Sequence, residues 1–377
     1  MKFIHTADWQ LGMTRHFLDG EAQPRFGQAR LDAVGTIGQL AVDEGCVFVV
    51  VSGDVFESNQ IDRQVLARAL DVMAATPEVT FYLLPGNHDP LNAASIFLAN
   101  TFREQRQPNV VVLEDSVPIQ VAEGVELVAA PWMSKRPLQD LVDQACAAAV
   151  PSAALRIIVG HGALDSRSPD ATDPALISLE RLEARIESDE IHYVALGDRH
   201  STTDEGATGR IWYSGAPEPT DYREEDPGSV LLVELEPGQI EVAPRSVGKW
   251  CFRQHESHLT SDADIDSLEQ WLDALEDKRR TVAKLSLVGS VSLGQKERLD
   301  RLLDRFADLL AALETWERRS DLVVVPDDAE TSALGLAGFA SDALGDLREL
   351  ARSPDPAEAV RAQNAMALLH RLGRSAS

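Results

Sequence analysis

The segment VTFYLLPGNHD, residues 79–89, decides the fold class of this chain. Its first half is an apolar run of strand length, and the Pro-Gly pair that follows stops the strand and turns the chain. Asn87, His88 and Asp89 come directly after this turn. In layered α/β proteins, ligand-binding loops gather at the carboxyl ends of the strands. The segment therefore predicts a buried strand that ends in a functional loop.

The chain before this segment alternates between strand and helix patterns. Residues 2–5 have a strand pattern, and residues 28–44 place their apolar side chains on one helical face. A continuous, mostly β-branched run covers residues 47–51, as in a strand buried on both faces. A second helical pattern covers residues 62–75. This order predicts an α/β layered domain with short polar loops after the strands.

The pattern changes twice further along the chain. Short strand patterns continue until the first domain is predicted to close, which gives it residues 1–247. Residues 248–328 are predicted to form a small α+β module, with one helix over 262–277 and a long amphipathic helix over 296–318. Residues 329–377 are rich in Ala, Leu and Arg and are predicted to form a helical tail.

Five loops that follow predicted strands carry side chains suited to metal binding. They are HTADWQ (5–10), SGDVFE (52–57), PGNHD (85–89), VGHG (159–162) and GDRH (197–200). Hard divalent cations prefer carboxylate and carbonyl oxygen, and imidazole is added for Mn, Fe or Zn. Two such cations about 3.5–4 Å apart can hold the attacking and leaving oxygens of an in-line phosphoryl displacement. The set predicts a two-metal phosphoesterase.

Each of these residues alone also has a structural explanation. Asp8 and Asp54 could cap a helix or solvate a loop, which are the common uses of Asp after a strand. His161 alone could be a packed loop histidine. The ordered combination with Asn87 and His200 favours the metal site over these explanations.

The order of these motifs resembles the calcineurin-like metallophosphoesterases. Within that family, HTADWQLG, SGDVFE, LPGNHDP, GHG and ALGDRH are similar to the bacterial SbcD-type DNA-repair nucleases. The resemblance covers roughly the first two-thirds of the chain in motif. It implies a four-layer α/β/β/α sandwich, followed by a small α+β capping domain and a helical C-terminal tail.

The resemblance also implies a set of metal ligands with Asp54 bridging two ions. The first ion would bind Asp8, Gln10, Asp54 and His200, and the second would bind Asp54, Asn87, His161 and Asp198. A hydroxide between the ions would attack phosphorus, with its pKa lowered by them. His88 would assist the leaving oxygen, and Asp89 would orient His88.

Two positions depart from the family pattern, which has His where this chain has Gln10 and Asp198. The amide oxygen of Gln10 is a weak, neutral ligand, whereas Asp198 adds a negative charge. These changes shift the site toward oxygen ligation. We therefore expect two divalent ions, Mn²⁺ before the alternatives Mg²⁺, Fe or Zn²⁺.

The net charge of −26, from 61 acidic and 35 basic residues, argues against a broad basic face that wraps DNA. It leaves a nuclease open, because a metal pair supplies positive charge where a phosphate binds. The main prediction is an exonuclease or endonuclease that cleaves DNA in repair. One alternative is a phosphoesterase for a small or nucleotide substrate, which fits the charge better. The other is a DNA-end scaffold whose site has decayed at Gln10.

The resemblance implies two macromolecular partners, DNA and an SbcC-like SMC ATPase that binds the C-terminal helices, and a homodimer is also possible. An apolar stripe in the tail fits either this docking or a helix folded back on the chain; its residues are Leu344, Leu347, Leu350, Val360, Ala365, Leu368 and Leu369. The longest apolar runs, such as residues 46–51, are far shorter than a membrane span. Three distant cysteines and the lack of a signal-peptide pattern lead us to expect a cytoplasmic protein without a membrane contact.

Overall fold

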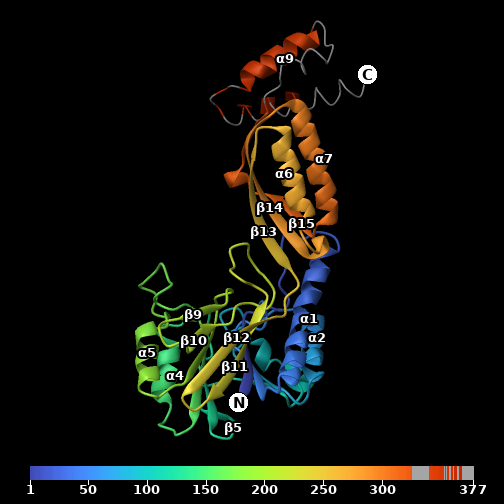
Figure 1. The fold of residues 1–377 in the computed structure, drawn as a ribbon. Helices are drawn as coiled ribbons and strands as arrows, with labels where there is room; N and C mark the ends of the chain where they lie inside the picture. The colour runs from blue at the N-terminus through green and yellow to red at the C-terminus, as the bar shows by residue number, and fades with distance from the viewer. Residues whose placement is uncertain are drawn as a thin grey trace. The chain divides into compact units, whose positions relative to one another are not determined.

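The computed structural model describes residues 1–324, 339–351, 353, 355, 358–359, 361–362 and 365–366. The chain forms two compact units (Figure 1). The larger unit comprises Met1–His16 and Gln23–Trp250, and the smaller unit comprises Phe17–Ala22 and Cys251–Ser377. The expected division into three parts, with boundaries after residues 247 and 328, stays a prediction.

The first sheet of the larger unit has six strands in the order β12-β11-β1-β2-β3-β4. The four strands from β1 to β4 are parallel, and β11 and β12 extend the β1 edge in antiparallel pairing. Their bounds are β1 Lys2–Thr6, β2 Phe48–Val51, β3 Thr80–Leu83, β4 Val110–Val112, β11 Ser229–Glu236 and β12 Gln239–Ser246. Helices α1 (Ala22–Asp43) and α2 (Arg63–Ala74) cover one face of this sheet (Figure 1). A 3-10 turn, Ile96–Leu98, and the short helix α3, Asn100–Gln105, connect β3 to β4.

The second sheet also has six strands, in the order β5-β6-β7-β8-β10-β9. Strands β6, β7, β8 and β10 are parallel, and the edge strands β5 and β9 are antiparallel to their neighbours. The bounds are β5 Ile119–Ala122, β6 Val125–Ala129, β7 Leu155–His161, β8 Tyr193–Gly197, β9 Thr203–Glu205 and β10 Ile211–Tyr213. Helices α4 (Leu141–Ala148) and α5 (Leu179–Glu187) lie on its outer side (Figure 1).

The side chains of β2 show how the layers are held together. Phe48 and Val50 point into a core between the two sheets, where they meet side chains such as Ile157 of β7. Val49 and Val51 point the other way, into the core beneath α1 and α2. Alternate strand residues face opposite sides, so a strand buried on both faces is apolar throughout. A further core lies between the second sheet and α4 and α5. The four-layer α/β/β/α sandwich is thus confirmed.

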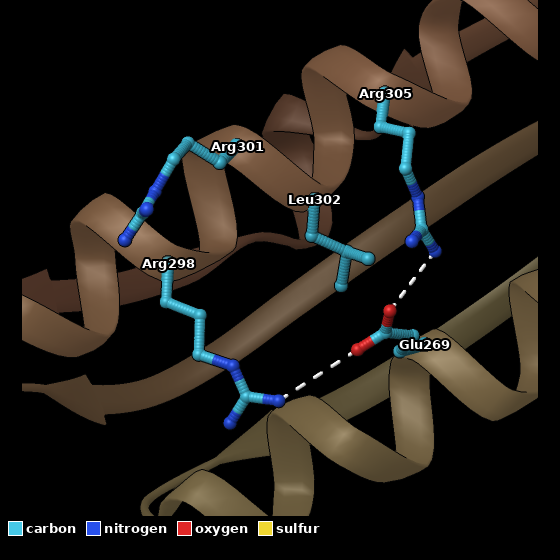
Figure 2. Close-up of a pocket in the computed structure, with 5 residues that line it drawn as sticks. All are labelled: Glu269, Arg298, Arg301, Leu302 and Arg305. Carbon is cyan, nitrogen blue, oxygen red and sulfur yellow. Dashed lines mark ion pairs between the residues drawn. The ribbon is translucent and has the colours of Figure 1, made fainter.

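The smaller unit is built on a parallel sheet of four strands, in which β14 pairs with each of the others. Its strands are β13 Cys251–Leu259, β14 Thr281–Val291, β15 Ala312–Thr315 and β16 Asp321–Val324. Helices α6 (Asp262–Asp273) and α7 (Leu293–Leu309) pack on it through an apolar core that includes Leu268 and Phe306. Figure 2 shows Glu269 of α6 between two arginines of α7, 3.7 Å from Arg298 and 2.9 Å from Arg305.

The helix predicted over residues 296–318 was wrong in its last third. The helix α7 ends at Leu309, whose side chain is 46% exposed, and Ala312–Thr315 forms β15. The amide of Ala311 donates to the carbonyls of Lys278 and Thr281 and so leads the chain into the sheet. Pairing with the already formed edge of β14 satisfies backbone groups that a longer helix would have used.

The tail is described in part. The helix α9 covers Phe339–Leu350, and Leu347 and Ala351 pack against the core of the smaller unit, in which Met366 is buried. Leu347, a member of the predicted tail stripe, therefore packs back on the chain, whereas Leu350 of the same stripe is 42% exposed. Of the predicted tail stripe, Val360, Leu368, Leu369 and the side chain of Leu344 lie outside the described residues. Among the described residues, no helix is long and apolar enough to cross a membrane.

Candidate metal centre

The parallel strands bring the predicted ligand loops to one edge of the sandwich. The loop after β1 carries Asp8 and Gln10, and it runs beside the loop after β2. The amide of Asp8 donates to the carbonyl of Gly53 at 3.1 Å, and the amide of Gln10 donates to the carbonyl of Asp54 at 2.9 Å. Both side chains are buried, with exposed fractions of 0% for Asp8 and 2% for Gln10. Backbone pairing therefore fixes these two candidate ligands beside Asp54.

Four of the predicted ligands have left-handed backbone conformations. The φ angles are 54° at Asp8, 42° at Gln10, 53° at Asp54 and 95° at Asp198. Non-glycine residues seldom adopt positive φ, and such strain concentrates at functional sites where the surrounding structure enforces it. The fold thus bends the chain at these residues and turns their side chains into one place.

Glycine is required where the loops meet. A Cβ atom on Gly86 would lie 2.2 Å from Oδ1 and 2.5 Å from the amide nitrogen of Asp54. A Cβ atom on Gly53 would lie 2.1 Å from Nδ1 of His161. No side chain can occupy either place, so the glycines that precede Asp54 and Asn87 allow the two sheets to bring their ligands together.

Asn87 and His161 lie against the carboxylate of Asp54. Nε2 of His161 is 3.4 Å from Oδ1 of Asp54. It is also 2.8 Å from one of the two terminal atoms of the Asn87 side chain, which is either the amide oxygen or the amide nitrogen. When that atom is the amide nitrogen, it donates to both oxygens of Asp54, at 3.1 and 3.0 Å. The other ring nitrogen of His161, Nδ1, is 2.8 Å from the carbonyl of Ser52. The backbone therefore directs Nε2 of His161 into the site.

Asp198 and His200 complete the group from the end of β8. The amide of Asp198 donates to both oxygens of Asp8, at 3.2 and 3.1 Å, and its Oδ1 is 3.9 Å from Nε2 of His161. Nε2 of His200 is 3.9 Å from Oδ1 of Asp8. On its other side, Nδ1 of His200 contacts Thr220 and Glu224, at 2.6 and 3.0 Å.

His88 lies beside Asp54 and is half-buried. Its Nε2 is 3.9 Å from Oδ2 of Asp54, its Nδ1 is 2.9 Å from the carbonyl of Glu57, and its backbone amide donates to Oδ1 of Asp54 at 2.9 Å. The carbonyl of Glu57 therefore orients the ring.

The expected contact between Asp89 and His88 is not formed. The buried carboxyl group of Asp89 instead accepts hydrogen bonds from the amides of Phe56 at 2.9 Å and Gly86 at 2.8 Å. These amides lie in the two turns that carry the ligands, and buried amides need acceptors. In this structure Asp89 therefore ties the turns together, and a catalytic role for it stays a prediction.

Burial and mutual charge shift the pKa values of the site. Burial raises the pKa of Asp8 to about 6. Burial also opposes charge on Asp54 and His161, but their attraction outweighs it, so the pKa of Asp54 is lowered and that of His161 is raised well above its usual value. Perturbation of this kind is typical of functional sites.

A divalent cation fits this set of donors. Asp8, Asp54 and His161 each offer one ligand atom, and these atoms lie within 4.8 Å of one another. Oε1 of Gln10 is buried and has no hydrogen-bond partner. A buried carbonyl oxygen without a partner is costly unless it meets a donor or a cation.

The structure brings Asp8, Asp54, Asn87, His161, Asp198 and His200 into one network of contacts and buries Gln10 beside them. His5, which begins the first loop motif, has a structural role instead, because its ring contacts the hydroxyl of Tyr193 and the carbonyl of Leu196. Sequence reasoning missed Thr220 and Glu224, because they follow no strand and lie in an acidic stretch that looks like a solvated loop.

The sandwich fold with this donor set defines a metal-dependent hydrolase of phosphoester bonds. The family model described as calcineurin-like phosphoesterase matches residues 1–233, and the chain belongs to that family. The family uses a pair of metal ions, in agreement with the cluster of ligand atoms.

Comparison with individual proteins gives more limited likenesses. The chain is similar to the SbcD subunit of the SbcCD nuclease of Rhodobacter capsulatus, with 33% identity over 94 residues. The match covers 24% of this chain and 22% of the length of that relative. A crystal structure of TT1561 of Thermus thermophilus has a TM-score of 0.40 and 11% identity, covering 65% of this chain and 98% of that one. A likeness at that level adds nothing to the assignment of function.

Proposed function

We propose that this chain is a phosphodiesterase that uses two divalent metal ions to cleave DNA. The observation that carries the proposal is the buried group formed by Asp8, Asp54 and His161, beside the unpartnered oxygen of Gln10. The choice of DNA is supported by the match to a relative that is named as part of a nuclease.

The proposed ligands are those that the motifs imply. Asp54 would contact both ions; the first would also be held by Asp8, Gln10 and His200, and the second by Asn87, His161 and Asp198. Three of these seven side chains are carboxylates, so the site carries a negative charge that a pair of divalent cations offsets. Oxygen donors outnumber the two imidazoles, and we therefore propose Mn²⁺ as the working metal.

The protein's own residues suit a phosphoryl displacement. When bound, the metal ions supply positive charge for the phosphate oxygens and lower the pKa of water. Because Glu57 presents a carbonyl oxygen, Nδ1 of His88 carries the hydrogen of that bond, which leaves Nε2 to face the site. His88 in its protonated form can donate from Nε2 to the leaving oxygen. Asp89 holds the turns that carry Asp54 and Asn87 at a fixed separation.

The proposal includes the organisation of the protein. We propose residues 1–247 as the nuclease domain, 248–328 as a capping domain and 329–377 as a helical segment. The relative's name describes one subunit of a complex, and this supports an SbcC-like SMC ATPase as partner, which we propose binds through the C-terminal helices. A cytoplasmic location and a homodimer belong to the same proposal.

A second candidate is a phosphoesterase that acts on small or nucleotide substrates. The net charge of −26 favours it, because a chain this acidic repels a long polyanion at low salt. Cleavage of bis-p-nitrophenyl phosphate, cyclic nucleotides and DNA ends by the same preparation separates the two candidates. Hydrolysis of DNA supports the nuclease, whereas turnover of small esters alone, even with an SMC-like ATPase added, contradicts it.

The same assay tests whether the site is catalytic at all. In Asp54→Asn, hydrolysis is expected to fall by on the order of 100-fold or more, since removing even an outer partner of a metal ligand costs 10–100-fold. His88→Ala is expected to lower kcat while metal binding is retained. Equal background activity in wild type and both variants would favour a DNA-end scaffold with a decayed site.

A further inference from the structure

We propose that Glu224 is a positioning residue that fixes the orientation of His200 and thereby sets how tightly the first metal ion binds. The inference rests on the proposed role of His200 as a ligand of that ion. Glu224 lies in none of the five ligand loops and 24 positions beyond His200, so the motifs did not indicate it.

The hydrogen-bond roles around His200 leave one arrangement. Glu224 approaches Nδ1 at 3.0 Å with Oε1, and an ionised carboxylate only accepts hydrogen bonds. The hydroxyl of Thr220, 2.6 Å from Nδ1, donates to the same Oε1, so toward the ring it can only accept as well. Nδ1 of His200 therefore carries the hydrogen. In the neutral ring the lone pair then lies on Nε2, which is 3.9 Å from Oδ1 of Asp8.

Glu224 is itself held in place. Its side chain is 6% exposed, its Oε2 accepts from the amide of Thr220 at 2.8 Å, and its Oε1 accepts from the amide of Asp221 at 3.0 Å. These hydrogen bonds to the backbone of residues 220 and 221 already fix the Glu224 carboxylate. Its side chain therefore loses no further freedom when it contacts the imidazole of His200.

The turn is also attached to its surroundings. The guanidinium group of Arg15 donates to the carbonyl of Thr220 at 2.6 Å, and the amide of Glu225 donates to the hydroxyl of Ser201 at 2.9 Å. Ser201 follows His200 directly, so the turn and the ligand loop are joined at two adjacent points. Folding alone thus places Glu224 against the ring.

The two imidazoles of the site are supported differently. His161 has the neutral carbonyl of Ser52 behind it, whereas His200 has the charged Glu224. In the proposed site His200 shares its ion with Gln10, a neutral ligand. A carboxylate behind a ligating imidazole makes the imidazole more basic and holds its ring in place. Glu224 therefore offsets the weak ligation by Gln10.

Titration of the full, metal-free chain with Mn²⁺ by calorimetry tests the proposal. In Glu224→Gln, one of two binding steps is expected to weaken by about 10–100-fold, while the other step is unchanged. The control is Glu225→Gln, which removes the same charge one residue away, where the side chain is exposed. Affinities equal to wild type in Glu224→Gln, or equal losses in both variants, would overturn the proposal.

Two further variants keep the outcome interpretable. His200→Ala must weaken one binding step; if it does not, the proposed ligand set is wrong. A loss in His200→Ala but none in Glu224→Gln refutes only the role of Glu224. If Glu224→Gln does not fold in chelator, as judged by circular dichroism, Glu224→Asp takes its place, because it keeps the charge but shortens the reach of the carboxylate toward the ring. If one of the two Mn²⁺ binding steps is weaker in that variant, the result supports the positioning of His200 by Glu224. Two steps with wild-type affinity contradict it.

The offset between Glu224 and Gln10 has its own test. In a Gln10→His background the first ion gains a stronger ligand, so the loss caused by Glu224→Gln is expected to be smaller than in the wild type. The electron paramagnetic resonance spectrum of bound Mn²⁺ reports on the metal site without an activity assay. It can be recorded for the wild type, Glu224→Gln, Gln10→His and the double variant. Equal losses in both backgrounds would contradict the offset.

Discussion

At the scale of single residues, the site depends on how closely the loops approach Asp54. Its carboxylate has His161, His88 and the Asn87 amide around it, and the turn that carries Asn87 passes so close that Gly86 has no room for a side chain. The proposed metal site therefore depends on glycine as much as on carboxylates.

Replacing Gly86 by Ala is expected to abolish metal binding. The added Cβ would lie 2.2 Å from Oδ1 of Asp54, which forces the carboxylate or the turn to move. Gly27→Ala in α1 is the control, because its Cβ would meet nothing within 4 Å and Ala is the better helix former by roughly 1 kcal/mol. Calorimetric titration with Mn²⁺ measures the outcome, and normal two-ion binding by Gly86→Ala would refute the packing argument.

The pH dependence of stability tests the buried carboxyl group of Asp89. Burial, and then repulsion by Asp54, raises its pKa from 3.8 to about 7. Between pH 3.8 and about 7, the folded state therefore keeps a proton on Asp89 that the unfolded chain has already released. In chelator, the free energy of unfolding should fall as the pH rises through that window, by up to about 1.4 kcal/mol per pH unit.

Asp89→Asn cannot release this proton, so it should lose that part of the slope, while the similar contribution from Asp8 remains in both proteins. Denaturant unfolding at pH 4, 5, 6 and 7 measures the two slopes. Parallel curves for wild type and Asp89→Asn would contradict the raised pKa.

At the scale of elements, the contact between α6 and α7 allows the contribution of surface charge to stability to be compared with that of core packing. Glu269 pairs with Arg298 and Arg305 on the exposed side, whereas Leu302 lies beneath them in the core (Figure 2). Exposed ion pairs contribute roughly 0–1 kcal/mol, and truncation of a buried Leu costs about 2–5 kcal/mol.

Glu269→Gln is therefore expected to lower the stability of the smaller unit slightly, and Leu302→Ala to lower it several times more. Chemical denaturation in low and high salt measures both changes. Only the effect of Glu269→Gln should shrink with added salt, because ions screen exposed charges. A larger loss for Glu269→Gln than for Leu302→Ala would contradict this order.

The elements also show what could be predicted from the sequence. Strands β2 and β3 were predicted from apolar runs of strand length; β2 is buried on both faces, whereas Thr80 and Tyr82 of β3 are only half-buried. The loops after them followed from the Gly-Asp and Pro-Gly turns. Strand β15 was missed because Leu313 continues the helical spacing of α7, and only the edge of β14 decides between helix and strand. The partners of His200 and Asp89 were missed for a related reason. Hydrogen bonds between distant loops leave no periodic signal in the sequence.

At the scale of the whole molecule, the acidity of the chain and its metal site have to be reconciled. A net charge of −26 opposes the approach of DNA, and the site itself is rich in carboxylates. In the proposed site, two divalent ions would offset this negative charge at one edge of the sandwich. Binding of any phosphoester should therefore depend on the metal far more than on the protein's own cations.

The central claim is that one site holds two catalytic metal ions bridged by Asp54. Metal analysis of the full chain after equilibration with Mn²⁺, set beside hydrolysis of bis-p-nitrophenyl phosphate, tests it most directly. The account predicts two ions per chain in the wild type, and in Asp54→Asn a loss of bound metal together with the loss of hydrolysis. A single tightly held ion in a fully active wild type, or full activity in Asp54→Asn, would contradict it.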